Sequence, residues 1–240
     1  MTSQTAARIL AALKRQRLAC DRMSFGRPVH TVYNPYGYAW DAVRLFVETF
    51  ATGPRRVLFL GMNPGPWGMA QTGVPFGEVA AVRDWMGLSP KVRAPAIQHP
   101  ARPVEGLACP RSEVSGRRFW GLMGERFKFP ADFFRGHFVL NYCPLMFVSA
   151  TGANLTPDKL PAREQQPLAA ACDNALAGVI EALRPEFLVG VGGFAESALR
   201  RVAPDARVVR LLHPSPASPA ANRDWAGAAV RQLTAAGVWS

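Results

Sequence analysis

Short, continuous apolar runs separated by helix-like stretches constrain the fold of this 240-residue chain more than any other feature. A run without polar alternation is typical of a strand that a parallel sheet buries on both faces. Such runs occur at Val57–Leu60, Phe138–Leu140, Phe187–Val189 and Val208–Leu212. They predict four core strands.

The stretches between these runs predict helices. Residues 1–24 carry Ala6, Ile9, Leu10 and Leu13 at helical spacing, which indicates an amphipathic amino-terminal helix. Further helices are expected at Asp41–Phe50, Gly77–Met86, Arg117–Phe127, Ala162–Leu183, Phe194–Val202 and Trp225–Ala236.

Because strands alternate with helices, we expect an α/β fold with a central, mostly parallel four-stranded sheet, covered by helices on both faces and connected by right-handed crossovers. We expect residues 1–240 to form a single domain, with the helix of residues 1–24 packed on it. Residues 88–115 are rich in proline and polar side chains and are long for a loop, which favours a functional excursion.

The formal net charge is +11. Such a charge suits a polyanionic partner such as nucleic acid, because each neutralised phosphate releases a condensed counterion. The excess is almost all arginine, however, and nucleotide composition alone can also raise arginine content. Charge therefore leaves both interpretations open.

Cysteine usage and hydropathy argue against a metal centre and against secretion. The four cysteines, Cys20, Cys109, Cys143 and Cys172, are far apart and form no C-x-x-C pair, so we expect reduced structural residues and no metal. The amino terminus lacks a signal pattern, and no apolar stretch approaches the roughly 20 residues needed to cross a bilayer. We therefore expect an intracellular protein with no membrane partner.

Asn63 lies in a rigid loop directly after the first apolar run. Gly61, Met62, Pro64, Gly65 and Pro66 surround it, and the glycines allow unusual backbone angles while the prolines stiffen the turn. This loop would fix a side chain or a water molecule beside a ligand at the carboxyl end of a strand. The alternative is an ordinary strand-to-helix turn in which Asn63 caps its neighbour. Farther along, Phe76 offers a ring that can stack on a flat base.

Asn141 ends the second run and offers both a carbonyl and an amino group. An amide held in one orientation pairs with the N3–H and O4 of uracil, whereas cytosine presents the opposite order. Such a site rejects the wrong base by up to roughly 10⁴-fold. A hydrogen-bonded strand-end asparagine without a role in binding is the alternative.

His213 ends the fourth run and opens a proline-rich loop that contains Pro214, Ser215, Pro216, Ala217 and Ser218. A donor placed near a leaving base lowers the barrier to N-glycosidic cleavage, and His213 can supply it as a neutral N–H or as imidazolium. The stiff loop can contact phosphates and enter the gap left by an extruded nucleotide. By contrast, Gly190–Gly193 does not match the G-x-G-x-x-G fingerprint, so no nucleotide cofactor is expected.

These motifs, read in order, resemble the single-strand-selective monofunctional uracil-DNA glycosylase family of the uracil-DNA glycosylase superfamily. The resemblance covers most of the chain beyond the first helix. Its matching segments are residues 32–35, 61–77, 113–116, 141–145, 154–157, 189–192 and 213–225.

The resemblance implies a three-layer α/β/α fold, a DNA substrate and a flipped uracil. Asn63 would hold the attacking water and His213 would stabilise the leaving base, with Phe76 stacking on the base and Asn141 reading its edge. Gly61, Met62 and Pro64 would complete the pocket, and Gly65 and Met69 would shape it around C5, where oxidised groups such as hydroxymethyl fit. The product would be an abasic site, formed without a lyase step, a metal or a cofactor.

Two departures from the family pattern affect the expected activity. Other branches of the superfamily have an aspartate where this chain has Asn63, and an amide cannot accept a proton as a general base. Vertebrate members have Arg-Asn where this chain has Ala217-Ser218, which predicts a weaker grip on duplex DNA. Two alternatives stay open: a damaged-DNA or single-strand binding module with little turnover, and a nucleotide-cofactor enzyme.

Overall fold

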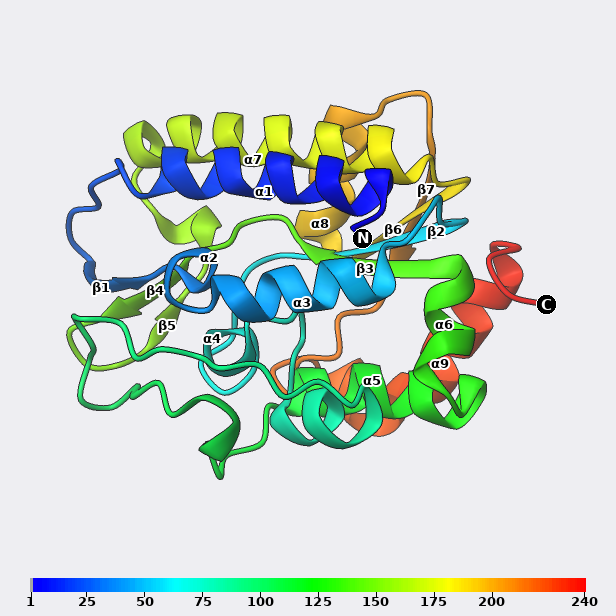
Figure 1. Cartoon of the computed structure of the whole chain (residues 1–240), viewed down its shortest axis with the longest axis horizontal. Helices are drawn as coiled ribbons and strands as arrows, with labels where there is room; N and C mark the ends of the chain where they lie inside the picture. The colour runs from blue at the N-terminus through cyan, green and yellow to red at the C-terminus, as the bar shows by residue number, and fades with distance from the viewer. Residues whose placement is uncertain (1) are drawn as a thin grey trace.

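A four-stranded parallel sheet with strand order β3-β2-β6-β7 lies at the centre of the computed structural model, which describes residues 2–240 (Figure 1). Its strands are β2 (Val57–Gly61), β3 (His137–Asn141), β6 (Phe187–Val191) and β7 (Arg207–Leu211). All residues of β2, β3 and β6 are buried, which explains their unbroken apolar sequence. The predicted parallel sheet is confirmed.

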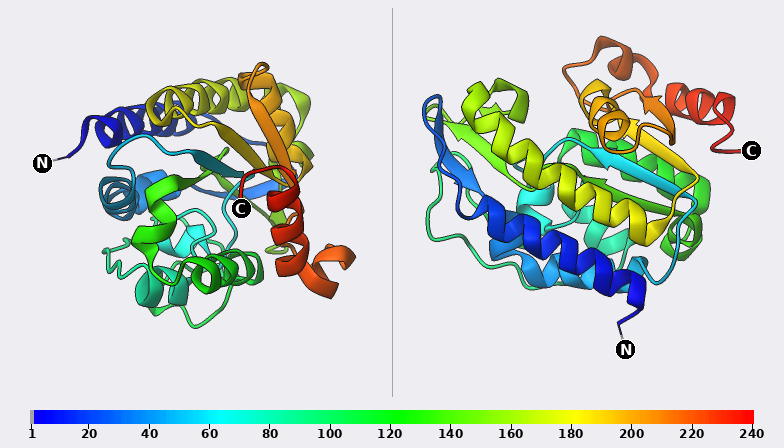
Figure 2. Two further views of the ribbon diagram at one scale, coloured as in Figure 1. Left: turned by 90° about the vertical axis from the view of Figure 1, so that its right-hand side faces the viewer. Right: turned by 90° about the horizontal axis from the view of Figure 1, so that it is seen from above.

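Helices cover both faces of this sheet (Figures 1 and 2). Helices α1 and α7 lie side by side above the sheet together with α8, and α5 and α9 lie on the other side. The long helices are α1 (Gln4–Cys20), α3 (Trp40–Phe50), α5 (Val114–Phe127), α7 (Ala162–Leu183), α8 (Gly193–Val202) and α9 (Pro219–Ala235), and the short ones are α2 (Pro35–Tyr38), α4 (Met69–Thr72) and α6 (Pro130–Gly136). The expected layered α/β arrangement is therefore present.

A second, antiparallel sheet with strand order β1-β4-β5 was not predicted. It consists of β1 (Val29–Tyr33), β4 (Met146–Ser149) and β5 (Asn154–Leu155). Its strands are short, and β1 pairs with a segment more than 100 residues away, as in the Val32–Phe147 pair. Local periodicity cannot detect a pairing of this kind.

The largest differences between predicted and observed helices occur at Gly77–Met86 and at the start of α9; α5 also begins three residues earlier than predicted, at Val114. In place of a helix over Gly77–Met86, a π-helix spans Ala81–Trp85, because Phe76 and Gly77 form a tight turn against α5. At Gly116 of α5, a Cβ would lie 2.2 Å from the carbonyl oxygen of Phe76. Helix α9 begins at Pro219, six residues before the predicted start, and Asp224 interrupts it with non-helical angles of φ −164° and ψ 78°.

The long segment before α5 is tied to the turn that follows β2. The side-chain amide of Gln71 donates to the carbonyl oxygens of Pro66 (2.9 Å) and Pro103 (2.8 Å), and it accepts from the backbone N–H groups of Glu105 and Gly106. Four hydrogen bonds to one buried side chain hold this excursion in place. It ends at the cavity described below.

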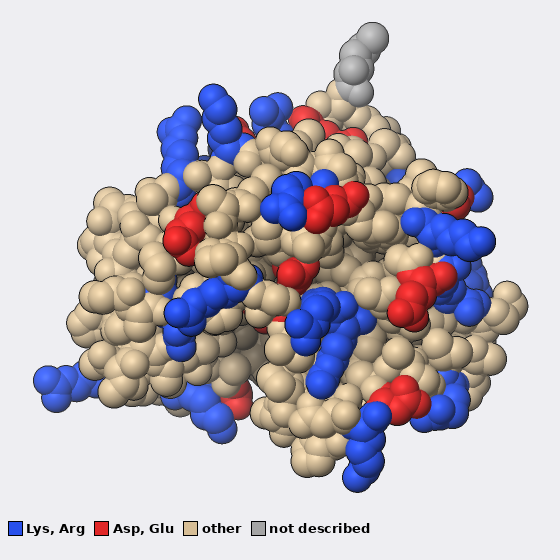
Figure 3. All heavy atoms as spheres, turned by 90° about the horizontal axis from the view of Figure 1, so that it is seen from below, with Lys and Arg blue, Asp and Glu red and all other residues tan. Residues whose placement is uncertain are grey.

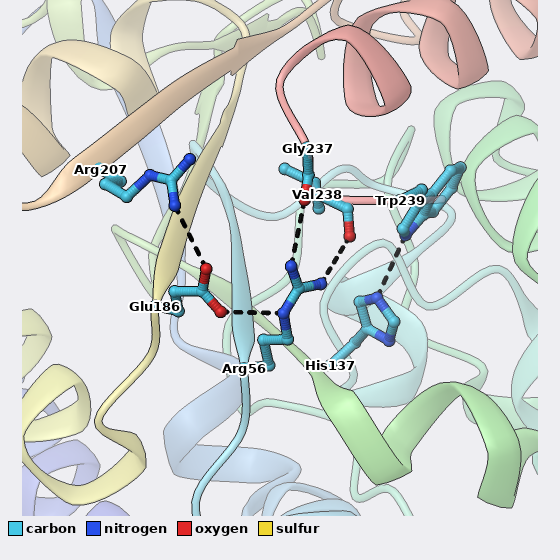
Figure 4. Close-up of polar contacts among 7 residues, drawn as sticks. All are labelled: Arg56, His137, Glu186, Arg207, Gly237, Val238 and Trp239. Carbon is cyan, nitrogen blue, oxygen red and sulfur yellow. Dashed lines mark hydrogen bonds and ion pairs between the residues drawn. The ribbon is translucent and has the colours of Figure 1, made fainter.

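The carboxyl terminus closes the opposite end of the sheet (Figure 4). Arg56 donates to the carbonyl oxygens of Val238 (2.8 Å) and Gly237 (3.1 Å) and pairs with Glu186 at 2.9 Å. The indole N–H of Trp239 donates to Nε2 of His137 over 3.2 Å. Nδ1 of His137 therefore carries the proton and donates to the carbonyl oxygen of Phe133 (2.8 Å).

Burial lowers the pKa of His137 to about 4. Between this value and the ordinary 6.5 the unfolded chain binds more protons than the folded chain, so stability falls as the pH falls. Between pH 7 and pH 5 His137 should remove about 2 kcal/mol from the free energy of unfolding. His137→Gln, which cannot titrate, should lack this loss. Urea denaturation of both proteins at pH 7 and pH 5 measures this loss of free energy of unfolding. An equal loss in the unaltered protein and in His137→Gln would contradict the prediction.

The cysteines and the apolar segments have ordinary structural surroundings. Cys20, Cys109, Cys143 and Cys172 are all free and buried. Within residues 2–240, no helix combines the length and the apolar character that spanning a membrane requires.

Candidate active site

A cavity of about 410 Å³ opens beside the carboxyl ends of β2 and β3. It brings together Asn63, Asn141 and His213, which follow three different strands, as the sequence predicts for the edge of an open α/β sheet. Its walls are formed by Met62, Asn63, Pro64, Gly65, Pro66, Met69, Phe76, Glu113, Ser115, Asn141, Asn154, Thr156, His213, Ser215 and Pro216.

Asn141 is fixed at the bottom of this cavity. It is the last residue of β3, is 4% exposed, and pairs in register with Gly61 of β2. Its Nδ2 donates to the sulfur of Met69 over 3.1 Å, which sets the orientation of the amide. Its Oδ1 is buried and has no hydrogen-bond partner among residues 2–240. A ligand with an N–H group would satisfy this oxygen.

Gly61 allows Asn141 and Phe76 to approach the strand. A Cβ at this position would lie 2.3 Å from Oδ1 of Asn141 and 2.7 Å from Cζ of Phe76. These distances are far below a van der Waals contact, so a side chain here would displace both groups. Gly61 therefore acts by its small size.

Phe76 presents an aromatic ring at the cavity wall. Its backbone adopts a left-handed conformation with φ 52°, which is rare for a residue with a side chain. Trp120 stabilises this turn by donating to the carbonyl oxygen of Pro75 (3.3 Å). The ring stacks on Phe119, with centroids 4.8 Å apart and planes 13° apart. Phe119 supports one face of the ring, which leaves the other for a ligand.

Asn63 is oriented by the loop that follows β3. Its Nδ2 donates to the carbonyl oxygen of Leu145 (3.2 Å), so its Oδ1 is the atom available to the cavity. The loops that follow β2 and β3 run side by side. The backbone N–H of Tyr142 donates to the carbonyl oxygen of Gly61 (2.9 Å), and the backbone N–H of Cys143 donates to that of Met62 (2.8 Å). Asn63 can thus accept a hydrogen bond from a water molecule.

His213 is held as a neutral imidazole. Its Nδ1 accepts a hydrogen bond from the backbone N–H of Ser215 (3.1 Å), so the proton lies on Nε2. Burial also lowers the pKa of His213 below 6.5. Gly192, with φ 90°, lies against the ring, since a Cβ there would be 3.2 Å from Cδ2. Of the two forms that the sequence left open, the neutral donor fits this geometry.

The loop after His213 is anchored by Arg118, a residue that the motifs did not single out. Arg118 donates to the carbonyl oxygen of Pro214 (3.0 Å) and to Oδ1 of Asn222 (2.9 Å). Asn222 in turn donates to the carbonyl oxygen of Pro216 (2.8 Å). Pro214 is buried and shapes the loop, whereas Pro216 and Ala217 are exposed at its tip.

The hydroxyl groups of this loop are partly engaged within the protein. Oγ of Ser218 accepts from the backbone N–H of Ala221 (3.3 Å) and caps α9, while Oγ of Ser215 accepts from that of Ala217 (3.1 Å). Each hydroxyl still has a proton to donate. Each hydroxyl can therefore donate a hydrogen bond to a phosphate oxygen.

Five cavity residues were not predicted as site residues: Pro66, Glu113, Ser115, Asn154 and Thr156. Asn154 belongs to β5 and Thr156 follows it, in the sheet that local periodicity could not detect. Glu113 and Ser115 lie where the proline-rich excursion meets α5, and the matching 113–116 segment was the only signal for them. Burial raises the pKa of Glu113 to about 7.

The face of the molecule drawn in Figure 3 carries both basic and acidic side chains, with the basic ones prevailing. Lys and Arg side chains stand on several sides of a hollow near the centre of the face drawn in Figure 3, with Asp and Glu between them. The net charge of +11 favours approach of a polyanion to such a surface. Within residues 2–240, no three His, Cys, Asp or Glu side chains are grouped so that they could hold a metal ion.

Comparisons with known proteins show the family to which the chain belongs. Residues 49–234 match the Uracil DNA glycosylase superfamily. The chain is 50% identical to the single-strand selective monofunctional uracil-DNA glycosylase of Rattus norvegicus, covering 90% of this chain and 80% of that protein. It is 49% identical to the Bos taurus protein of the same name, covering 90% and 81%.

The fold also matches a solved structure. Pedobacter heparinus SMUG2 superposes with a TM-score of 0.65 over 95% of this chain and 97% of that one, at 19% identity. The class that the fold and these matches define is the uracil-DNA glycosylase superfamily. Within it, the chain belongs to the family of single-strand-selective monofunctional uracil-DNA glycosylases.

Gly61→Ala should damage the site without unfolding the protein. The added methyl group would push Asn141 or Phe76 out of place, and we expect uracil release from DNA to slow by about tenfold or more, equivalent to about 1.4 kcal/mol of lost transition-state stabilisation. Gly121→Ala in α5 is the matched control, because a Cβ there meets nothing within 4 Å. Single-turnover rates measure the effect, and similar rates for both variants would contradict the assignment of Gly61.

Proposed function

We propose that the protein is a monofunctional DNA glycosylase that flips uracil out of single- or double-stranded DNA and hydrolyses its N-glycosidic bond. The product is an abasic site, the first intermediate of base excision repair. One observation carries the proposal above the others: Asn141 lines the same cavity as His213, Met69 fixes the orientation of its amide, and its Oδ1 has no hydrogen-bond partner among residues 2–240.

Base recognition follows from the orientation of the Asn141 amide. Its Oδ1 accepts the N3–H of uracil, and its Nδ2, which has a second hydrogen beyond the one directed at Met69, donates to O4. Cytosine would place an unprotonated N3 against the same oxygen and leave it buried and unpaired. Phe76 stacks on the flat face of the base.

Bond cleavage depends on stabilising the departing base. When the bond between C1′ and N1 breaks, its electron pair goes to uracil, and the sugar becomes oxocarbenium-like. The Nε2–H of His213 donates to the O2 atom on which negative charge gathers. The water held by Oδ1 of Asn63 then attacks C1′ to form the new C1′–O bond, and its extra proton passes to solvent. Because an amide cannot take the proton of this water, leaving-group stabilisation supplies most of the rate enhancement.

The 214–218 loop is the part of the protein that meets the DNA backbone. Ser215 and Ser218 can donate to phosphates, and the exposed tip at Pro216 and Ala217 enters the space left by the flipped nucleotide. Residues 1–240 would act as one domain and as a monomer. The enzyme would work inside the cell where the DNA lies, in the nucleoid of a bacterium or the nucleus of a eukaryote.

Uracils oxidised at C5, such as 5-hydroxymethyluracil, are further proposed substrates. Gly65 and Met69 line the cavity, and we expect the flexible Met69 side chain to adjust to a small polar substituent there. The binding-module alternative predicts tight binding to uracil-containing DNA without product release.

Removal of His213 tests the proposed function directly. Excess protein is incubated with labelled single-stranded DNA that contains one uracil, and abasic sites are then cleaved with alkali. We expect His213→Ala to slow excision by roughly 10²–10³. His30→Ala is the control, since His30 is exposed on β1 and does not line the cavity. Equal rates would remove His213 from the mechanism, and DNA that is bound but intact with the unaltered protein would favour the binding module.

The small side chain of Ala217 should weaken action on duplex DNA. Extrusion of a nucleotide from a duplex costs a few kcal/mol more than from a single strand, and a short side chain compensates for little of this cost. We expect faster cleavage of single-stranded uracil than of a U:A pair, and a smaller difference in Ala217→Arg. Ala7→Arg on α1 controls for the added charge. Equal cleavage of both substrates by the unaltered protein would contradict this expectation.

A further inference from the structure

The carboxyl group of Glu113 occupies the space that a side chain at position 65 would fill. A Cβ on Gly65 would lie 2.2 Å and 2.3 Å from the two carboxyl oxygens, and a Cβ on Gly68 would lie 2.7 Å from Oε2. Glu113 is the residue before α5 and lines the same cavity as Asn141. The wall near Gly65 is therefore a carboxyl group rather than bare backbone.

One oxygen of this buried carboxyl group has no hydrogen-bond partner, and no cationic side chain pairs with the group, among residues 2–240. Its Oε2 is buried without a hydrogen bond, and no salt bridge involves Glu113 within residues 2–240. Burial raises its pKa to about 7; the backbone N–H groups of Trp67 and Gly68 oppose this rise, and the charge of Glu78 adds to it. A buried polar atom left unpaired is destabilising, and a ligand that pairs with it removes this cost.

The Asn141 amide shows which edge of the base this wall faces. Its Nδ2 lies on the Met69 side, so the base oxygen O4 that pairs with Nδ2 also lies on that side. In the uracil ring C5 is bonded to C4, the atom that carries O4. C5 therefore lies next to O4, on the same side of the base. The turn from Gly65 to Met69, with Glu113 filling it, therefore borders C5.

We propose that Glu113 is a specificity-determining residue whose carboxyl group hydrogen-bonds a polar substituent at C5 of the flipped base and disfavours a methyl group there. The inference rests on the proposed glycosylase function and deepens it. A hydroxymethyl group gives the unpaired oxygen a partner, whereas the methyl group of thymine would bury it further without one. Unsubstituted uracil has only a hydrogen atom at C5, so it neither pairs with the carboxyl group nor presses against it.

The ratio of excision rates on two bases tests this role. Single-turnover rates are measured on single-stranded DNA with one 5-hydroxymethyluracil or one uracil, for the unaltered protein, Glu113→Gln and Glu113→Leu. Each ratio comes from one preparation, so a loss of folded protein cancels. We expect Glu113→Leu to lower the ratio by about tenfold or more, while Glu113→Gln, which keeps hydrogen-bonding atoms, stays within about threefold.

Each other outcome overturns the inference in a distinguishable way. An unchanged ratio in Glu113→Leu would mean that the carboxyl group does not contact the C5 substituent. Equal loss of both activities in Glu113→Gln would indicate a proton-accepting role instead. An unaltered protein that releases neither base would overturn the proposed function itself, and this inference with it.

The predicted contact with Gly65 provides a second, independent measurement. Gly65→Ala should slow uracil release by about tenfold or more in the unaltered background, because its methyl group collides with the carboxyl group. In a Glu113→Ala background the same change should cost less than about threefold, since the space is then free. Equal effects in the two backgrounds would contradict the assigned position of Glu113.

Discussion

The close parallel pairing of β2 and β3 at their carboxyl ends is the constraint on which the site depends. Gly61 and Asn141 face each other in register, and the missing side chain at Gly61 lets the Asn141 amide and the ring of Phe76 meet. The two loops that leave these strands then run together and orient Asn63 through Leu145. The buried apolar strands thus place base-reading and water-holding groups on one rigid edge.

Two of the buried polar atoms that have no hydrogen-bond partner among residues 2–240 belong to the cavity residues. Oδ1 of Asn141 and Oε2 of Glu113 are both buried and unpaired, and each costs about 1–3 kcal/mol in the free protein. The aromatic and aliphatic core beneath them offsets this cost. A base that donates hydrogen bonds to these oxygens recovers part of this free-energy cost, whereas a base that presents acceptors at the same positions does not. Selectivity therefore comes from polar groups left without partners before the substrate arrives.

The sequence predicts the framework well because the buried strands have a strong local signal. The runs at Val57, Phe138 and Phe187 mark three adjacent strands, and the segments that follow the runs at Val57 and Phe138 supply about half of the residues that line the cavity. The sequence does not predict β1, β4 and β5, because these strands pair with segments far away in the chain. Nor does it predict the turn at Phe76, which depends on the close approach of Gly116 in α5. Glu113 and Arg118 were missed for the same reason: only the folded chain brings them to the site.

The protonation of His213 and the identity of Asn63 point to the same chemical strategy. In the proposed mechanism a neutral imidazole donates a hydrogen bond without giving up its proton, so His213 would stabilise a uracil anion rather than produce neutral uracil. An amide at position 63 can direct a water molecule but cannot activate it. Bond breaking must then run well ahead of water attack, because a weak nucleophile suffices once the sugar is an oxocarbenium-like cation. In such a mechanism the shape and polarity of the base pocket, rather than a strong general base, determine which lesions are removed.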